Sequence, residues 1–171
     1  MSVKSVANNL NDISKTHPGL VADIAKKWYG NNRDTDWIVK HGCRTLLKKG
    51  NRDVLDIFGF ADAGCVKGRG VFALESASVC IGGNMTFSFS VEAHKAARIR
   101  LEYGIDYVKA NGSRSRKIFQ ISELSLKENE RKAYTKKTFF CRCKYQNALS
   151  RNHSVTLIVK RRRAGSIWIL K

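Results

Sequence analysis

The stretch ADAGCVKGRG, residues 61–70, separates two parts of the chain that have different hydrophobic periods. It holds three glycines in ten residues and has little periodicity of its own, which is typical of a connecting segment. Its glycines do not have the spacing of a dinucleotide-binding fingerprint, and no strand leads into them. Apolar residues recur every three or four positions before it and every second position after Val71. We therefore expect two domains, helical over 1–60 and β-rich over 71–171, joined by a linker over 61–70.

The first sixty residues are expected to form short helices joined by tight turns. Pro18 suits the first turn of a new helix, so one helix ends just before it. Asp34 or Thr35 can cap the third helix, and Gly50 ends it. The pattern is a helix, a short turn and a second helix, repeated about twice. The apolar stripes of the second, third and fourth helices are Leu20, Ile24 and Trp28, then Val39, Cys43, Leu46 and Leu47, then Val54, Leu55 and Phe58.

The second part of the chain has the two-residue period of half-buried strands. In MTFSFSVEA (85–93) and RIRLEYGIDYV (98–108), apolar and polar residues alternate. Several short strands joined by turns predict an antiparallel β-sandwich that is immunoglobulin-like in layout. The fold class is therefore α+β, with a helical segment followed by this sandwich. Further strands are expected in RKIFQISEL (116–124), TKKTFFCRC (135–143), SVTLIVK (154–160) and GSIWILK (165–171).

The net charge is the strongest indication of function. Lys and Arg number 32 against 14 acidic residues, which gives a formal charge of +18. Such an excess destabilises the chain through self-repulsion unless an anionic partner binds. Nucleic acid is the first candidate, an acidic membrane surface the second, and a ribosomal protein a third. No run of about 20 apolar residues is present, so no membrane-spanning segment is expected, and there is no signal-peptide core.

The cysteines indicate a reducing compartment and no metal site. Their number, five, is odd and their spacing scattered, unlike a secreted disulfide framework. The pair Cys141 and Cys143 supplies two ligands on one strand face, but no second pair completes a zinc site. We expect free, mostly buried thiols, and no metal or cofactor.

Basic residues cluster in two places that suit phosphate. Lys40, Arg44 and Lys48 recur every fourth residue on the expected third helix, with Trp37 and His41 near the same side. The loop KANGSRSRK (109–117) holds a second cluster, and KRRR (160–163) is a further basic turn. A solvated helix face or turn is the alternative for each cluster, and the overall charge favours contact with phosphate. The basic residues of the loop are Lys109, Arg114, Arg116 and Lys117.

The opening helix carries a polar side that helix propensity disfavours. Ser5, Asn8, Asn9 and Asp12 lie on one side of a helical wheel, opposite the apolar stripe. One interpretation is a solvated face, or asparagines that brace neighbouring helices. The other is a carboxylate, Asp12, that stabilises positive charge on a sugar or orients a water. Composition alone favours the first interpretation.

Long segments of both parts resemble DNA alkylation repair proteins of the AlkC type. These are HEAT-like helical-repeat DNA glycosylases that remove alkylated bases such as 3-methyladenine, and many carry an immunoglobulin-like module. The resemblance implies that Asp12 is one of the acidic residues on the concave face, whereas the other active-site acids and a tryptophan lie upstream of this chain. The segments are KSVANNLNDISKTHPGLVADIAKKW (4–28), DTDWIVKHGCRTLLKKGN (34–51), VLDIFGF (54–60), IGGNMTFSFSVE (81–92), LEYGIDYVKANGSRSRKIFQISE (101–123) and SVTLIVK (154–160).

The resemblance implies a C-terminal half that binds alkylated double-stranded DNA in the bacterial cytoplasm, associated with the nucleoid when bound. Asp12 would be the catalytic residue, with little activity because most of the cleft is absent. A non-enzymatic DNA-binding module, or a subunit that docks on a protein carrying the missing repeats, are the alternatives. The expected DNA-binding residues are Asn8, Asn9, Trp37, Lys40, His41, Arg44, Lys48, Lys109, Arg114, Arg116 and Lys117.

Overall fold

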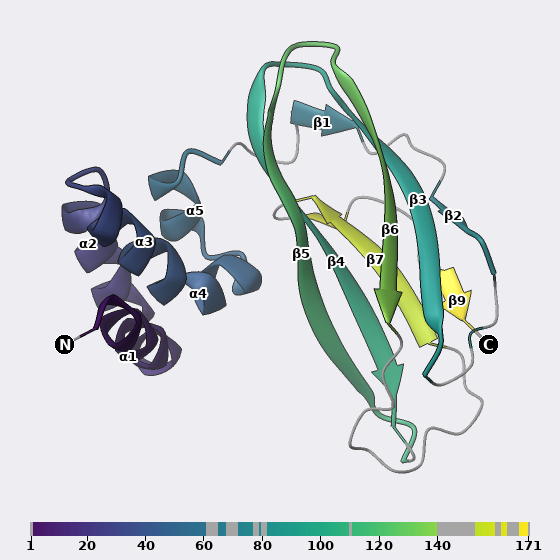
Figure 1. The fold of residues 1–171 in the computed structure, drawn as a ribbon, viewed down its shortest axis with the longest axis horizontal. Coiled ribbons are helices and arrows are strands. Elements are labelled where there is room, and N and C mark those ends of the chain that lie inside the picture. Colours follow the sequence, from purple (N-terminus) through teal and green to yellow (C-terminus); the bar gives the residue numbers. More distant parts are fainter. Residues whose placement is uncertain are drawn as a thin grey trace. The chain divides into compact units, whose positions relative to one another are not determined.

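The structure is a computed structural model, and contacts divide it into two compact units, Met1–Ala61 and Asp62–Lys171 (Figure 1). It describes residues 2–60, 65–67, 72–76, 79, 82–109, 111–139, 153–159, 162–163 and 168–170. The expected CRC pair of cysteines lies outside the described residues, as does the start of the KRRR turn.

The first unit consists of short helices whose ends are fixed by the local sequence. Ser2 caps the first helix, because its Oγ accepts a hydrogen bond from the Ser5 amide at 3.3 Å. Pro18 is the first residue of the second helix, as predicted. Gly50 ends the fourth helix in the left-handed conformation, with φ of 72°. The helices are α1 (Val3–Thr16), α2 (Pro18–Trp28), α3 (Arg33–Gly42), α4 (Arg44–Lys49) and α5 (Arg52–Ile57).

The third predicted helix is in fact two helices that are interrupted at Cys43. In a continuous helix the Thr45 amide would donate to the carbonyl of His41. Instead it donates to Oδ1 of Asn11 on α1, at 3.3 Å, and the Thr45 hydroxyl donates to the same oxygen at 2.8 Å. The His41 carbonyl accepts from Arg44 Nη1 at 3.2 Å. The expectation of one helix was therefore wrong, because a side chain from α1 takes the place of a helical carbonyl.

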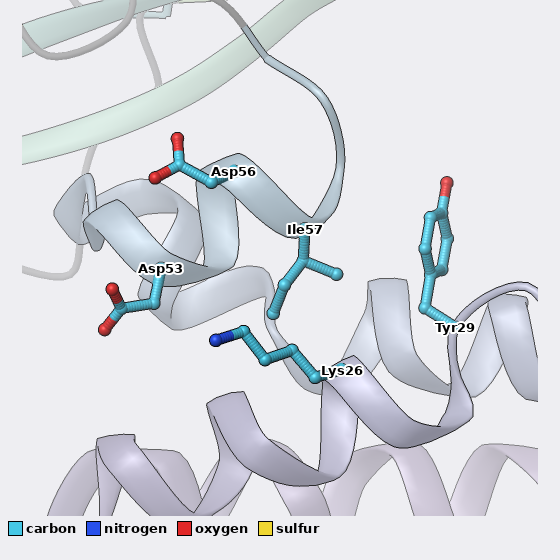
Figure 2. Close-up of a pocket in the computed structure, with 5 residues that line it drawn as sticks. All are labelled: Lys26, Tyr29, Asp53, Asp56 and Ile57. Carbon is cyan, nitrogen blue, oxygen red and sulfur yellow. The ribbon is translucent and has the colours of Figure 1, made fainter.

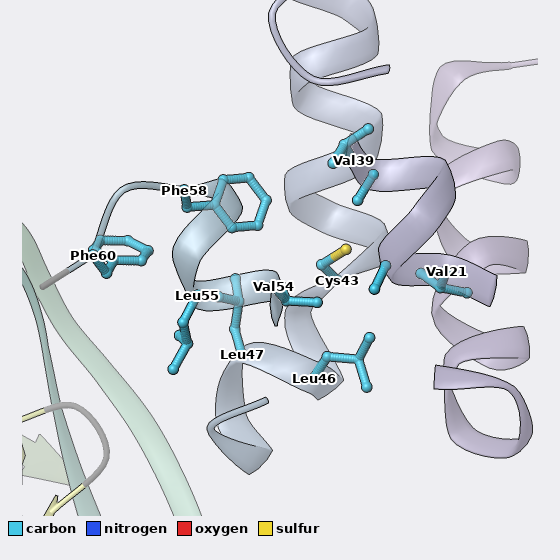
Figure 3. Packing of buried hydrophobic residues seen from close by; sticks show 11 residues of the cluster. Val21, Val39, Cys43, Leu46, Leu47, Val54, Leu55, Phe58 and Phe60 are labelled. Atoms are coloured by element: carbon cyan, nitrogen blue, oxygen red, sulfur yellow. The ribbon is translucent and has the colours of Figure 1, made fainter. Parts of the chain in front are cut away.

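An apolar core lies among α2, α3, α4 and α5, and its side chains point toward one another in Figure 3. A smaller cluster of Ala7, Leu10 and Ile38 lies between α1 and α3. Burial raises the pKa of the Cys43 thiol to about 11, so this cysteine is a protonated core residue. The buried members of the main core are Val21, Ala22, Ala25, Val39, Cys43, Leu46, Leu47, Val54, Leu55, Phe58 and Phe60.

The second unit is built from antiparallel strands in two sheets. In one sheet β3 is central, with β6 on one side and the short strands β1 and β2 also paired to it. In the other, β4 lies between β5 and β7, and β8 and β9 pair with β7. The strands are β1 (Val66–Lys67), β2 (Ala73–Leu74), β3 (Asn84–Ala93), β4 (Ala97–Val108), β5 (Arg114–Leu126), β6 (Arg131–Phe139), β7 (His153–Val159), β8 (Arg162–Arg163) and β9 (Trp168–Leu170).

The apolar residues predicted by alternation lie in contact between these sheets. The rings of Phe87 on β3 and Tyr103 on β4 are 5.2 Å apart, edge to face. The Tyr103 hydroxyl donates to Thr138 Oγ1 on β6 at 2.9 Å. Every alternate apolar residue of β3 from Met85 to Val91, and of β4 from Ile99 to Ile105, is buried. The period-two pattern therefore identified the packed faces of both strands.

Two features of this unit differ from expectation. Val66 and Lys67 lie within the expected linker, but they form β1 because their backbone pairs with Ala93 and Glu92 of β3. The polar side of β4 is also partly buried, because Arg100 and Glu102 on that side are almost fully covered. Charged side chains are rarely buried unless they are paired.

Candidate nucleic-acid interface

Asp12 lies on the polar side of α1, together with Asn8 and Asn9, and all three are exposed. Its side chain is 69% exposed and its Oδ1 accepts a hydrogen bond from Lys15 Nζ at 2.7 Å. This hydrogen bond, with the charges of Lys15 and Arg44, holds the pKa of Asp12 below its usual range. Asp12 is therefore a carboxylate at neutral pH, suited to stabilising positive charge and not to donating a proton.

Arg44, the first residue of α4, forms hydrogen bonds to both α1 and α3. Its Nη2 donates to Asn8 Oδ1 on α1 at 3.2 Å, and its Nη1 donates to the carbonyl of His41 on α3 at 3.2 Å. Arg44 is half-buried and its charge also acts on Asp12. The structure thus brings together Asn8 and Arg44, which are 36 positions apart in the sequence.

An exposed aromatic pair lies on α3. The rings of Trp37 and His41 are stacked, with centroids 4.2 Å apart and an interplanar angle of 14°. Trp37 is 41% exposed, and His41 is also exposed. We name Asn8, Asp12, Trp37, His41 and Arg44 the helical polar surface. Exposed flat rings, a guanidinium and a carboxylate are groups that can contact a base, a phosphate and a cationic sugar.

The basic stripe on these helices is only partly preserved. Lys40 and Lys48 are exposed, but they lie on α3 and α4, which are separate helices. Two neighbours of this surface were not among the predicted site residues: Lys15, which is three residues after Asp12 on α1, and the buried Asn11. The spacing of Asp12 and Lys15 was a signal for their ion pair, and the contact between Asn11 and α4 agrees with the interpretation that asparagines of this helix brace a neighbouring helix.

In the second unit, the expected loop is a tight turn between β4 and β5. The Lys109 amide donates to the Ser113 carbonyl at 2.8 Å, and the Gly112 amide donates to the Lys109 carbonyl at 2.9 Å. Gly112 has φ of 79°, which favours glycine. Asn111 Oδ1 accepts from the amide and the hydroxyl of Ser113, at 3.1 and 2.7 Å. Lys109 is exposed at this turn.

The three other basic residues of the loop lie on β5 and have distinct surroundings. Arg116 forms a bidentate pair with Asp106, through Nε at 2.6 Å and Nη2 at 2.5 Å. The pair lowers the pKa of Asp106 and raises that of Arg116. Arg114 Nη1 donates to Ser154 Oγ at 3.3 Å, and Lys117 Nζ lies 5.4 Å from the centre of the Tyr107 ring. Arg116 therefore braces β4 against β5, and Arg114 and Lys117 are exposed on β5.

A hollow between α2 and α5 contains none of the expected site residues (Figure 2). It is lined by Lys26, Tyr29, Asp53, Asp56 and Ile57. Its two carboxylates disfavour phosphate, so we assign the hollow no part in DNA binding.

Among the residues that the structure describes, no cluster of three His, Cys, Asp or Glu side chains is placed to hold a metal ion, and no helix is long and apolar enough to cross a membrane.

In the described part of the chain, five helices are followed by antiparallel sheets, which makes it a mixed α+β protein, and comparison with known proteins identifies its class as one with an immunoglobulin-like domain. Residues 70–167 match the family model described as "Uncharacterised protein YhaZ, C-terminal Ig-like domain". The chain belongs to this family.

Two relatives extend the comparison. The protein YhaZ of Bacillus subtilis (strain 168) is 46% identical over 133 residues, which are 78% of this chain and 37% of that protein. The solved structure of Pseudomonas fluorescens alkylpurine DNA glycosylase AlkC, bound to DNA containing an abasic site analog, is similar with a TM-score of 0.89 and 30% identity. That similarity covers 98% of this chain and 47% of the AlkC chain. The chain therefore spans less than half the length of both relatives.

Proposed function

We propose that this chain is the DNA-binding C-terminal part of a DNA alkylation repair protein. The observation that carries the proposal is the similarity to DNA-bound AlkC, which extends over both units of the chain. In this proposal residues 1–60 are the last HEAT-like repeats and residues 71–171 are an immunoglobulin-like sandwich. The excess of basic residues supplies the attraction to a polyanionic duplex.

Asp12 is the proposed catalytic residue. When the N-glycosidic bond to an alkylated base breaks, its electrons leave with the base and the sugar becomes an oxocarbenium-like cation. An ionised carboxylate near that cation lowers the energy of the transition state, and water then adds to the sugar and releases a proton to the solvent. Lys15 opposes this effect while it is paired with Asp12, so a DNA phosphate that attracts Lys15 would free the carboxylate.

Phosphate contacts are proposed for both units. Lys40, Arg44 and Lys48 serve the helical unit, where Arg44 is already held by Asn8 and His41. In the sheet unit, Arg114 and Lys117 make the main contacts with DNA phosphates, and Lys109 at the turn makes a further one. Arg116 supports them indirectly through its pair with Asp106. Asn8, Asn9, Trp37 and His41 would contact sugar or base.

The expected phosphate contacts can be counted through salt dependence. The double variant Arg114→Gln with Lys117→Gln should reduce the slope of log affinity against log salt by about 1.8, because each lost phosphate contact removes about 0.9. Lys40→Gln with Lys48→Gln should have a similar effect. The measurement is fluorescence anisotropy with a duplex that contains an abasic-site analogue, over a range of salt concentrations.

A matched control has the same change in charge at another place. Lys26→Gln with Lys27→Gln on α2 should leave the slope nearly unchanged, because neither residue belongs to the proposed contacts. If all three double variants lose the same slope, the binding depends on total charge and the assigned surfaces are wrong.

We expect the chain alone to release little 3-methyladenine from methylated DNA, because one carboxylate does not form a complete cleft. Asp12→Asn should keep DNA affinity or raise it, since it removes a negative charge from the surface that meets phosphate. Chromatography of the released bases and anisotropy measure the two effects. Fast release that Asp12→Ala abolishes would show that the chain carries a working catalytic centre of its own.

A non-enzymatic DNA-binding module is the second candidate. It is favoured by the ion pair between Asp12 and Lys15, which occupies the carboxylate in the absence of DNA. In that case undamaged and abasic duplexes should bind with equal affinity and the same salt slope.

A further inference from the structure

Asn11 on α1 is a polar residue whose side chain is buried at the contact with α4. It is 4% exposed, and its Oδ1 accepts hydrogen bonds from the amide and the hydroxyl of Thr45, at 3.3 and 2.8 Å. Burying an amide oxygen without a partner is costly, so these two bonds favour one arrangement of Asn11 and Thr45. They fix the start of α4 relative to α1.

The bond from the Thr45 amide acts on the backbone beside Arg44. This N–H belongs to the planar peptide group that joins Arg44 to Thr45, so the bond to Asn11 fixes the orientation of that group. The side chain of Arg44 reaches the same helix, where its Nη2 donates to Asn8 Oδ1 at 3.2 Å. Asn8 and Asn11 are three residues apart on α1 and therefore lie on one side of it. Two asparagines of α1 thus hold two consecutive residues of α4.

The guanidinium of Arg44 is held at both of its Nη atoms. Nη1 donates to the carbonyl of His41 and Nη2 donates to Asn8, each at 3.2 Å. A guanidinium carries further N–H donors in the same rigid fork, so these bonds orient donors that a phosphate oxygen can use. An orientation that is fixed before binding reduces the entropy that DNA binding costs. Both bonds require the Arg44 backbone at its present position, which the contact between Asn11 and Thr45 maintains.

We propose that Asn11 is a positioning residue for DNA binding: by holding the peptide group between Arg44 and Thr45, it keeps the Arg44 guanidinium oriented for a phosphate. Since Arg44 is a phosphate contact in the proposed function, this role of Asn11 rests on that function. Asn11 is too deeply buried to meet the duplex, so it acts through Arg44. A purely structural role would instead lower DNA affinity equally whether or not Arg44 is present.

The first test is nuclear magnetic resonance of the isotope-labelled chain without DNA. Rotation of the guanidinium is slow when both Nη atoms are hydrogen-bonded, so Arg44 should give separate Nη signals, which Arg44→Lys identifies by their loss. Asn11→Leu should average these signals. Asn11→Asp keeps an oxygen acceptor for Thr45 and should keep the signals separate. Separate signals in Asn11→Leu, or averaged signals in the unchanged chain, would overturn the proposal.

The second test is a double-mutant cycle of DNA affinity, measured by anisotropy with the duplex that contains an abasic-site analogue. Asn11→Leu should weaken binding about tenfold when Arg44 is present, and about twofold or less in the Arg44→Gln background, because no guanidinium remains to be positioned. Equal losses in the two backgrounds would mean that Asn11 acts on the fold and not through Arg44.

Thr45→Val is a second variant that preserves the shape of the side chain and removes only its hydroxyl. It should weaken binding by a smaller factor than Asn11→Leu, again only when Arg44 is present, and circular dichroism verifies that each variant keeps its helices. If the unchanged chain does not bind the duplex, the proposed function fails. The resonance comparison contains no DNA, so it still decides whether Asn11 positions Arg44.

Discussion

Arg100→Met is expected to lower the free energy of unfolding by about 3–5 kcal/mol, the usual cost of removing one partner from a buried ion pair. Arg100 is 4% exposed and Glu102 is 5% exposed, both on the polar side of β4. Nε of Arg100 donates to Glu102 at 2.8 Å, and Nη1 donates to Glu123 on β5 at 2.7 Å. Methionine fills a similar volume but leaves two carboxylates near each other without the guanidinium between them.

The measurement is urea unfolding followed by far-ultraviolet circular dichroism. Arg98→Met is the matched control, because Arg98 is exposed on the same side of the same strand. Its cost should be about 1 kcal/mol or less, as for other exposed charges. Equal costs for the two variants would show that the ion pairs of Arg100 with Glu102 and Glu123 contribute no more than a surface charge.

These ion pairs join β4 to β5 close to the register shift at Leu101 and Glu102. Their loss should therefore also loosen β5, the strand that carries Arg114 and Lys117.

Local patterns in the sequence predicted the parts of the fold that local forces decide. The alternation in β3 and β4 depends only on which side of a strand meets the core, and the start of α2 depends on the fixed φ of Pro18. The break at Cys43 depends instead on Asn11, which is 34 positions before Thr45. The burial of Arg100 likewise depends on Glu123, 23 positions away. No window of a few residues contains both partners of such contacts.

In the candidate site too, local sequence patterns predicted single residues but not the contacts between distant parts of the chain. Trp37 and Arg44 were predicted from residue type and helical position and Asp12 from the family resemblance, and the structure connects Arg44 with Asn8 and His41. The contact between Arg44 and Asn8 depends on how α1 packs against the later helices, which no periodicity records. The ion pair of Arg116 was not predicted for a similar reason, since its bidentate partner Asp106 lies across a hairpin.

The close approach of α1 and α3 depends on Gly42, and Gly42→Val is expected to destabilise the helical unit by about 2–3 kcal/mol. A Cβ at this position would lie 2.8 Å from Leu10 Cβ and 3.5 Å from the Ala7 carbonyl oxygen. Leu10 Cβ is fixed to the backbone of α1, so it cannot move aside unless the helix moves. The better helix propensity of other residues, up to about 1 kcal/mol relative to glycine, offsets only part of this cost.

Gly19→Ala is the control, because a Cβ there meets nothing within 4 Å and the backbone is already helical. It should keep the stability or raise it by up to about 1 kcal/mol. Circular dichroism at 222 nm during thermal unfolding measures both variants. If α1 is displaced in Gly42→Val, Asn8 and Asp12 on α1 move relative to Arg44, and DNA affinity should fall at temperatures where the protein is still folded. Unchanged stability and affinity in Gly42→Val would mean that the distance between α1 and α3 does not set the geometry of the helical polar surface.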